Sequence, residues 1–307
     1  MQDELPGKKT LGEVGEDAIV DHLTKDLVHG ADVVAGAGDD CAVIEATEGH
    51  YRLLKTDSVI EKVHFLPEAE PEWVGWKAAA RVVSDFAAMG GGKPQHAMIT
   101  LIAPTDRELG WVSAIYGGIE RCAREFAFSI VGGETSRSPQ EAPITTLSVA
   151  MSGVIEKEQC VFRSGALEGD SIFVTGTLGG SLAGKHLRFT PRLREAAWLT
   201  ENFAPSIHAM MDLSDGLAKD LSRLANSSNQ GFTIDRDRLP RNEHCTIEQA
   251  IQDGEDYELL FTADPKADLI DRWKTQFPDL PLTQVGRILG PEDSDSLTGG
   301  WDPFEKD

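Results

Sequence analysis

The sequence predicts an α+β protein built from two domains. Its 307 residues are enough for two hydrophobic cores, because single domains usually contain about 100–200 residues. Strand-like and helix-like patterns follow one another without strict alternation, which favours α+β over a doubly wound parallel sheet. A polar loop, EKEQCVFRSGALEGDS, follows a strand-rich first half. We therefore expect an N-terminal domain at residues 1–155 and a C-terminal domain at residues 156–307.

Periodicity and breaker residues predict the elements of the first half. An amphipathic helix is expected at residues 11–27, where apolar residues share one face. A second helix is expected at 71–91, headed by Pro71, with an apolar stripe through Trp76 and Val83. Apolar, β-branched runs bounded by glycine and polar residues predict strands. The other expected elements are a helix at 107–126 and strands within 32–46 and at 51–65, 96–104, 128–137 and 144–155.

The second half is expected to open with a strand, a glycine turn and a helix of small residues within 171–185. MDLSDGLAKDLSRLA places three polar residues before a helix that begins at about Leu217. Later segments repeat the mixture of loops, strands and helices. They are expected to be a loop and strand at 253–264, a helix at 269–277 and a strand at 281–289.

The charge balance narrows the possible partners. The chain has 29 basic and 51 acidic residues, a net charge of −22. Such a surface repels nucleic acid backbones and anionic membranes, so neither is expected as a partner. Surplus acid suits a protein that gathers divalent cations, although for most carboxylates it serves only solubility.

The cysteines and the N-terminal residues indicate a reducing compartment. The four cysteines are far apart and form no C-x-x-C pair, which excludes a ribbon-type zinc site and gives no disulfide framework. No apolar signal core opens the sequence, and no apolar run approaches the length of a membrane span. We therefore expect a cytoplasmic protein.

Carboxylates recur where apolar elements end, beside glycine or small polar residues. Taken singly, most fit turn or cap residues. Asp85 differs, because it lies inside an apolar helix, where an unpaired carboxylate costs several kcal/mol. It either meets a local partner such as Arg81 or faces a ligand. Together the acids predict a convergent site for hard cations such as Mg²⁺. They are Asp39, Asp40, Asp57, Asp85, Glu134, Asp212, Asp215, Glu255 and Asp256.

Such a cluster indicates that a polyphosphate arrives with the cations, because Mg²⁺ bridges carboxylates to phosphoryl oxygens. The common nucleotide fingerprints are nevertheless missing. The sequence holds no G-x-x-x-x-G-K-[ST], no G-x-G-x-x-G between strand and helix, and no protein-kinase motif set. If the chain binds ATP, it does so with another fold.

Longer motifs identify that fold by resemblance. The chain resembles the thiamine-monophosphate kinases, within the aminoimidazole-ribonucleotide-synthetase-like ATP-binding superfamily, from about residue 12 to 304. The matching stretches, in order, are GAGDDCAVI, TDSVIEKVHF, GWKAAARVVSDFAAMGG, VGGETSRS, FRSGALEGDSIFVTGTLGGSLAG, MDLSDGLAKDLSRLA, DGEDYELLFT and GGWDPF.

The resemblance implies a reaction, a fold and a set of site residues. The γ-phosphoryl group of ATP would pass directly to thiamine monophosphate, giving thiamine diphosphate without a phosphoenzyme or a dedicated general base. The N-terminal domain would pair with its twin in a dimer that shares a β-barrel. By position, the family's Mg²⁺-associated residues are Asp40, Thr56, Asp57, Asp85, Asp212 and Asp215. Implied ATP contacts are Arg163, Ser214 and the turn at Gly133, and implied contacts to thiamine monophosphate are His64, Glu255 and Trp301.

One departure from the family pattern concerns the metal site. Glu134 stands in GGETS where the family usually has Asp, so a metal role for Glu134 requires the longer side chain to fit Mg²⁺ geometry. Selenophosphate synthetases and hydrogenase-maturation dehydratases are rivals in the superfamily, but the reactive cysteines they usually need have no counterpart here. The alternative from a different class is a non-catalytic or altered-substrate paralogue that binds nucleotide or thiamine phosphates.

Overall fold

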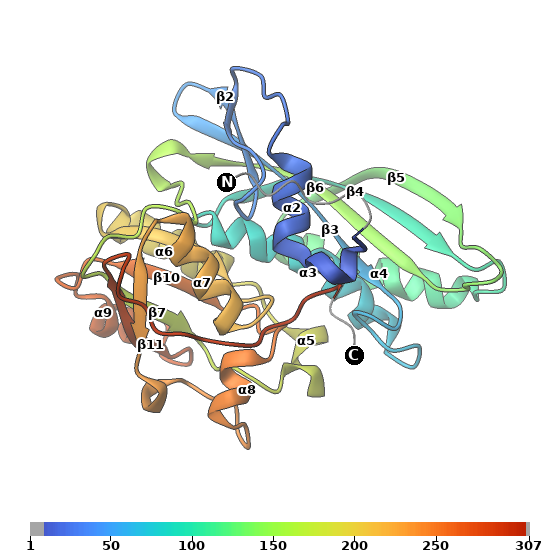
Figure 1. Cartoon of the computed structure of the whole chain (residues 1–307). Helices are drawn as coiled ribbons and strands as arrows, with labels where there is room; N and C mark the ends of the chain where they lie inside the picture. The colour runs from blue at the N-terminus through green and yellow to red at the C-terminus, as the bar shows by residue number, and fades with distance from the viewer. Residues whose placement is uncertain (1–8, 305–307) are drawn as a thin grey trace.

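The computed structural model describes residues 9–304 and folds them into two lobes, each built around one β-sheet (Figure 1). The ends of the two expected domains, residues 1–8 and 305–307, lie outside the described residues. Within the described part, the first lobe has a six-stranded sheet in the order β1-β2-β3-β6-β4-β5, antiparallel except between β4 and β5. Its strands are β1 (Val33–Ala35), β2 (Ala42–Thr47), β3 (His50–Ile60), β4 (Lys93–Ala103), β5 (Ser129–Arg137) and β6 (Thr146–Glu156).

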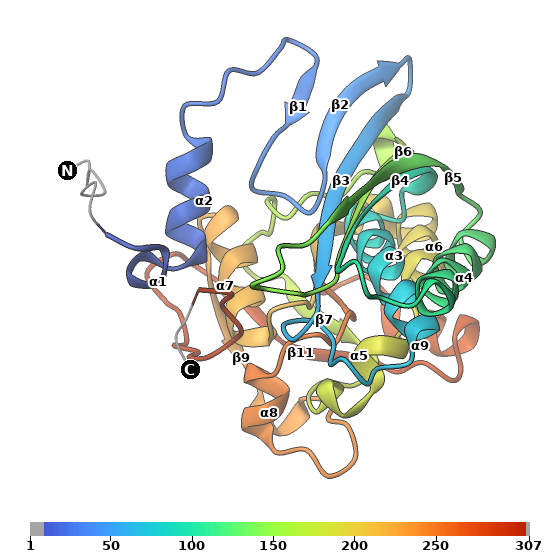
Figure 2. The ribbon, with the colours of Figure 1, turned by 90° about the vertical axis from the view of Figure 1, so that its right-hand side faces the viewer.

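Two long helices cover one face of this sheet. Helices α3 (Pro71–Ala88) and α4 (Leu109–Glu125) pack against each other and share a core with the alternate buried residues of β6. Figure 2 shows both helices on the same side of the sheet. The opposite face carries exposed apolar side chains, among them Leu54, Met98 and Val131. The first sheet is therefore packed on one side and bare on the other within a single chain.

The second lobe has a sheet that is covered on both faces. Its five strands follow the order β8-β10-β7-β11-β9, and all paired neighbours are antiparallel. Every residue of β7 and β10 is buried, because helices pack on both sides. The strands are β7 (Ser171–Thr175), β8 (Ile207–Asp212), β9 (Gly231–Ile234), β10 (Leu259–Ala263) and β11 (Leu282–Leu289). Helices α7 (Leu217–Ser227) and α8 (Ile247–Gln252) cover one face, and α6 (Leu193–Phe203) and α9 (Leu269–Gln276) the other.

The two ends of the described chain meet at α7. Arg223 of α7 forms ion pairs with Glu16 and Asp17 of α2 (Glu16–Thr24), and Lys219 pairs with Glu16 and Asp302. Figures 1 and 2 both place α2 beside α7. The N-terminal helix and the C-terminal tail are thus both held against α7.

The expected α+β class is confirmed, and several local expectations are corrected. The first helix breaks at Gly15 (φ 81°) into α1 (Leu11–Val14) and α2, which ends before residue 27. The run at 178–185 contains only short helical turns, because its glycines take positive φ. The remaining short helices are η1 (Lys157–Gln159), η2 (Ser181–Ala183), α5 (Lys185–Arg188), η3 (Ala204–Ser206) and η4 (Arg236–Arg238). The sequence patterns missed α6, α8, β8 and β9.

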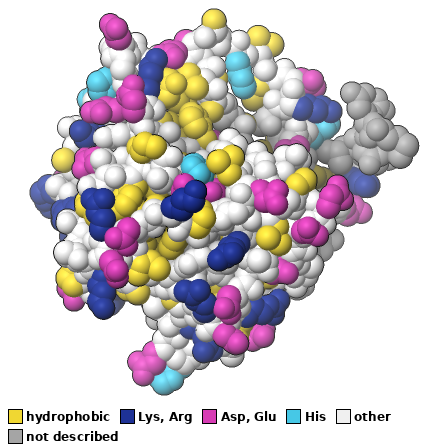
Figure 3. All heavy atoms as spheres, turned by 90° about the vertical axis from the view of Figure 1, so that its left-hand side faces the viewer, with side chains coloured by type: hydrophobic (Ala, Val, Ile, Leu, Met, Phe, Trp, Pro, Cys, Tyr) yellow, Lys and Arg dark blue, Asp and Glu magenta, His cyan; other side chains and the backbone are white. Residues whose placement is uncertain are grey.

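Two features of the structure concern the nucleic acids and membranes that the sequence argues against as partners. On the face drawn in Figure 3, acidic, basic and apolar side chains are interspersed rather than gathered by sign. Between residues 9 and 304, no helix is both long and apolar enough to cross a bilayer.

The first sheet ends at Glu156 and the second begins at Ser171. We propose the division into domains between these two strands.

Candidate functional site

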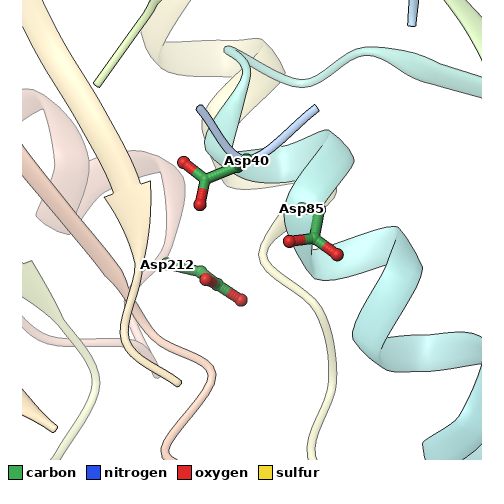
Figure 4. Close-up of side chains that lie close together, drawn as sticks. All are labelled: Asp40, Asp85 and Asp212. Carbon is green, nitrogen blue, oxygen red and sulfur yellow. The ribbon is translucent and has the colours of Figure 1, made fainter. Parts of the chain in front are cut away.

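Three carboxylates from distant segments meet between the lobes. Asp40 lies in the loop between β1 and β2, Asp85 in α3 and Asp212 at the end of β8. One oxygen from each lies within 4.8 Å of the others. Figure 4 shows the three side chains converging from a loop, a helix and a strand end. The structure thus brings together three of the acids that the sequence predicts to converge.

The environment of these acids is electrostatically unfavourable without a cation. All three are buried, and the Oδ2 atoms of Asp40 and Asp85 have no hydrogen-bond partner among the described residues. Burial raises the pKa of Asp85 well above its usual range, despite the opposing charge of Lys55. Burial and the neighbouring Asp40 raise the pKa of Asp212 to about 7. Hard divalent cations take such oxygen ligands, so the donor set fits Mg²⁺.

Local structure positions the turn that carries Asp40 and the carboxylate of Asp212. Gly38 (φ 114°) allows the turn before Asp39 and Asp40, and the carboxylate of Asp39 accepts from the N–H of Arg163 at 3.1 Å. The hydroxyl of Ser84, in α3, donates to Oδ2 of Asp212 at 2.6 Å. This last bond joins the helix of the first lobe to a strand of the second. The geometry of the site therefore depends on the packing of the two lobes.

Basic side chains pair with the acids one by one. Nζ of Lys55 lies 2.6 Å from Oδ1 of Asp85, and Nη2 of Arg163 lies 2.7 Å from Oδ1 of Asp40. The expected alternative partner of Asp85, Arg81, instead lies 3.0 Å from Oδ2 of Asp57. Side chains alternate along a strand, so Lys55 and Asp57 of β3 lie on the same face of the sheet. Lys55 therefore pairs with Asp85, and Arg81 pairs with Asp57 instead of Asp85. Asp40 and Asp85 thus each use one oxygen for a basic partner, and the other oxygen has no hydrogen-bond partner within residues 9–304.

The entrance of α7 holds its acids differently. The carboxylate of Asp215 pairs with Arg223 at 2.6 Å and with Lys219 at 3.7 Å. The backbone N–H groups of Ser214 and Asp215 both donate to Oδ2 of the buried Asp220. Gly216 (φ 102°) is required here, because a Cβ atom would lie 2.8 Å from the carbonyl oxygen of Gln252. Because the N–H of Ser214 is already bonded to Asp220, the expected ATP contact of Ser214 would have to come from its hydroxyl group.

Three residues implied by the family pattern lie apart from the three-acid cluster. Thr56 is exposed, and its hydroxyl lies 3.4 Å from that of Ser148, on the bare face of the first sheet. Gly133 and Glu134 belong to β5, an edge strand separated from β3 by β6 and β4. Glu134 pairs in register with Thr100 and is exposed. Within one chain, these residues do not join the acids between the lobes.

The residues implied for the acceptor substrate form a second group. Nδ1 of His64 accepts from the N–H of Ile60 at 3.0 Å, which leaves Nε2 to carry the ring proton. Burial, reinforced by the charge of Arg81, lowers the pKa of His64 to about 4, so the ring is neutral at pH 7. The ring of Trp301 meets that of His64 edge to face, with centroids 5.7 Å apart. Glu255 pairs with Lys77 of α3 and accepts from the hydroxyl of Tyr257.

A mostly apolar cavity adjoins this second group. It has a volume of about 410 Å³ and lies between the segment after β3 and the η2–α5 segment. His64 and His186 are its polar ring groups, and Phe65, Leu66 and Leu187 contribute to its apolar wall. Such a wall suits the ring system of an organic ligand. The acceptor end is therefore a mostly apolar hollow with one exposed carboxylate, Glu68, in its lining, whereas the three-acid cluster is compact and anionic.

The sequence patterns did not place Lys55 or Lys77 in the site, nor the bond from Ser84 to Asp212, whereas Arg81 and Arg163 were expected there in other roles. On α3 the residues Lys77, Arg81, Ser84 and Asp85 recur at helical spacing on an otherwise apolar helix and reach partners at both ends of the site. That stripe is the signal that could have found them. Lys55 carries no comparable signal, because a lysine in an alternating strand usually faces solvent.

Comparisons with known proteins match this architecture. The model of the AIR synthase related protein, N-terminal domain, matches residues 38–155, and that of the C-terminal domain matches residues 165–271. The thiamine-monophosphate kinase of Rhodopirellula baltica is 35% identical over 84% of this chain and 84% of its own. That of Aquifex aeolicus is 36% identical over 91% of this chain and 92% of its own.

A solved structure agrees with the family models. AaThiL complexed with AMPPCP and TMP superposes with a TM-score of 0.82 at 32% identity, covering 97% of this chain and 99% of that one. The protein therefore belongs to the thiamine-monophosphate kinase family, within the AIR synthase related proteins.

Proposed function

We propose that this kinase transfers the γ-phosphoryl group of ATP in line onto the phosphate of thiamine monophosphate, with Mg²⁺ as the cation. A bond forms between an acceptor phosphate oxygen and the γ-phosphorus, the bond to the β–γ bridging oxygen breaks, and ADP leaves. The observation that carries this proposal is the buried set of Asp40, Asp85 and Asp212, two of whose oxygens have no hydrogen-bond partner within residues 9–304, in a chain that also holds a mostly apolar cavity. The relative solved with AMPPCP and TMP supports the pairing of an ATP-like and a phosphorylated ligand.

The acids between the lobes are the proposed cation ligands. Asp40, Asp85 and Asp212 would hold the central ion, with Asp57 and Asp215 beside them on β3 and at α7. Bound Mg²⁺ supplies charge neutralisation for the phosphoryl oxygens during transfer. Arg163 contributes a fixed positive charge next to Asp40 and is proposed to contact ATP, as is the hydroxyl of Ser214.

The chemistry requires no general base from the protein. The acceptor is a phosphate that is already ionised at neutral pH, so no difficult proton has to be removed. The protein's contribution is to align two polyanions and to offset their repulsion. His64, Glu255 and Trp301 are proposed to hold the thiamine part, with the neutral His64 ring offering its Nε2–H as a donor.

We also propose that a second copy of the chain covers the bare face of the first sheet. A hollow of about 400 Å³ on this face is lined by apolar residues that include Leu54, Met98 and Val131. Thr56 lies on the same face of the sheet. Glu134 also lies on this face, because it is paired in register with Thr100 of β4. A pairing of sheets would bury this face and enclose both residues. Sedimentation of the wild type against Met98→Glu tests it, with a monomeric wild type counting against the dimer.

A coupled ADP-release assay tests the function. ADP should form only when ATP, Mg²⁺ and thiamine monophosphate are all present, and thiamine diphosphate should appear in equal amount. Binding of both ligands without ADP release would favour the non-catalytic alternative. ADP release that ignores thiamine monophosphate would indicate a different acceptor.

Glu134 has a separate test. Glu134→Asp should keep or raise the rate if this turn contributes to the cation site, because the shorter carboxylate matches the family residue. A large loss in rate would show that the site is built around the longer side chain.

A further inference from the structure

Lys77 is a fully buried cation at the acceptor end of the site. Its side chain has 0% exposure, although it lies on α3 between apolar neighbours. Nζ donates to the carbonyl oxygen of His64 at 2.8 Å and pairs with the carboxylate of Glu255. A buried ammonium is tolerated only with such partners, because desolvation opposes its charge. Both partners belong to residues proposed to hold the acceptor.

These contacts join three segments that otherwise have separate anchors. His64 follows β3, Lys77 lies in α3, and Glu255 precedes β10 in the second lobe. Glu255 has a φ of 65°, and its N–H donates to the carbonyl oxygen of Ser214 at 2.7 Å. The hydroxyl of Tyr257 donates to the other carboxylate oxygen of Glu255 at 3.3 Å. The Glu255 carboxylate is therefore held in one place, and Lys77 is the charge paired directly with it, while the more distant Arg81 forms its ion pair with Asp57.

The charge balance around Glu255 bears on ligand choice. At pH 7 the pair of Lys77 and Glu255 is neutral, and His64 is uncharged. An uncompensated carboxylate in this position attracts cations. Unphosphorylated thiamine carries only the positive thiazolium, whereas thiamine monophosphate has net negative charge at neutral pH. Loss of the positive charge of Lys77 should therefore strengthen the binding of thiamine and weaken the binding of thiamine monophosphate.

We propose that Lys77 is a specificity-determining residue, which positions Glu255 and cancels its charge so that the site favours the phosphorylated acceptor over the unphosphorylated cation. This inference rests on the proposed function and adds a role for a residue that touches no reacting atom. The effect operates through Glu255, so removal of both charges together should restore the balance.

The test compares the dissociation constants of thiamine and thiamine monophosphate by calorimetry, on the full chain with Mg²⁺ and a non-hydrolysable ATP analogue. Lys77→Met should lower the preference for thiamine monophosphate about tenfold, mainly through tighter thiamine binding. Lys157→Met is the matched control, because Lys157 forms a 2.6 Å ion pair with Glu45 at the surface. The control should leave the preference unchanged.

The double variant Lys77→Met/Glu255→Gln removes both charges of the pair and provides a second test if Lys77→Met does not fold. Its neutral pair should fold and keep a preference within about threefold of the wild type. Equal weakening of both ligands in Lys77→Met, or a double variant that loses the preference, would show a purely structural role and overturn the inference. A wild type that binds neither ligand, or releases no ADP with thiamine monophosphate, would instead overturn the proposed function and this inference with it.

Discussion

Helix α3 borders two regions of the site that differ in charge balance. At one end, Asp85 joins Asp40 and Asp212, where three carboxylates face two basic partners and two oxygens have no partner among the described residues. At the other end, Lys77 and Glu255 cancel each other beside the neutral His64. Under the proposed function, bound cations would complete the first region, whereas the second is formed in the protein alone. The same helix thus holds an ion-dependent half and a preorganised half.

Asp212→Asn is the strongest way to break the ion-dependent half. The amide keeps the shape and still accepts from Ser84, but it removes one charge from the cation site. Activity should fall by at least about a hundredfold, the scale seen when one preorganised electrostatic contact is lost. The melting temperature in chelator should not fall, because the change also removes repulsion from Asp40. Steady-state kinetics and thermal melts measure the two effects. Retained turnover would remove Asp212 from the cation ligands.

Removal of metal should separate the two halves without any mutation. Saturating Mg²⁺ should stabilise the wild type by about 2.7 kcal/mol at one hundred times its dissociation constant, since only the folded chain presents the three acids together. Asp212→Asn should lose most of this gain. Melts at a series of Mg²⁺ concentrations measure it. Equal stabilisation of both proteins would place the bound cation elsewhere.

Trp301→Ala should affect the preorganised half alone. Trp301 is 39% exposed and its ring meets that of His64, while its backbone N–H and carbonyl contact Asp215 and Lys219. The substitution keeps the backbone contacts, so the KM for thiamine monophosphate should rise about tenfold, the value of one aromatic contact, with little change in kcat. The Mg²⁺-dependent stabilisation should be unchanged. A parallel loss of that stabilisation would mean that the two regions are coupled.

The sequence predicted the ion-dependent half better than the preorganised one. Carboxylates after apolar elements are a local signal, and Asp40, Asp85 and Asp212 do meet. Glu134 follows an apolar run in the same way but lies on an edge strand. The local sequence pattern could not predict this, because it does not determine the order of strands in a sheet. The two domains followed from chain length and a polar loop, and the α+β class followed from periodicity. Short elements such as β9 and α8 offered too few residues for a period to appear.

The partners of the acids depended on contacts that local reasoning does not reach. Lys77 and Glu255 are 178 residues apart, and Ser84 and Asp212 are 128 apart. Each pair requires the two lobes to dock before the side chains can meet. A buried lysine also contradicts the usual preference of that residue for the surface, so composition argued against it. Tertiary packing, rather than propensity, decided these positions.

The smallest expected effect is a pH dependence of acceptor preference. Burial lowers the pKa of Lys77 to about 8, although Glu255 opposes the shift. The groups around it are Glu255 and Tyr257 before β10, His64 after β3, Asp57 in β3, Arg81 in α3 and His186 in α5. Burial lowers the pKa of His186 and raises that of Tyr257, while that of His64 is about 4. From pH 7 to 8.5, Lys77 is therefore the group expected to change charge.

Loss of that proton leaves the charge of Glu255 uncompensated, so higher pH should act in the same direction as Lys77→Met. The preference for thiamine monophosphate over thiamine should fall about threefold between pH 7 and 8.5, less than in the variant because Lys77 is only partly deprotonated. The phosphate of the acceptor ionises near pH 6 and contributes little in this window. Calorimetry at both pH values measures the change, and Lys77→Met should show none. A pH dependence that persists in the variant would assign the titration to another group and leave the charge of Lys77 without a role in the preference.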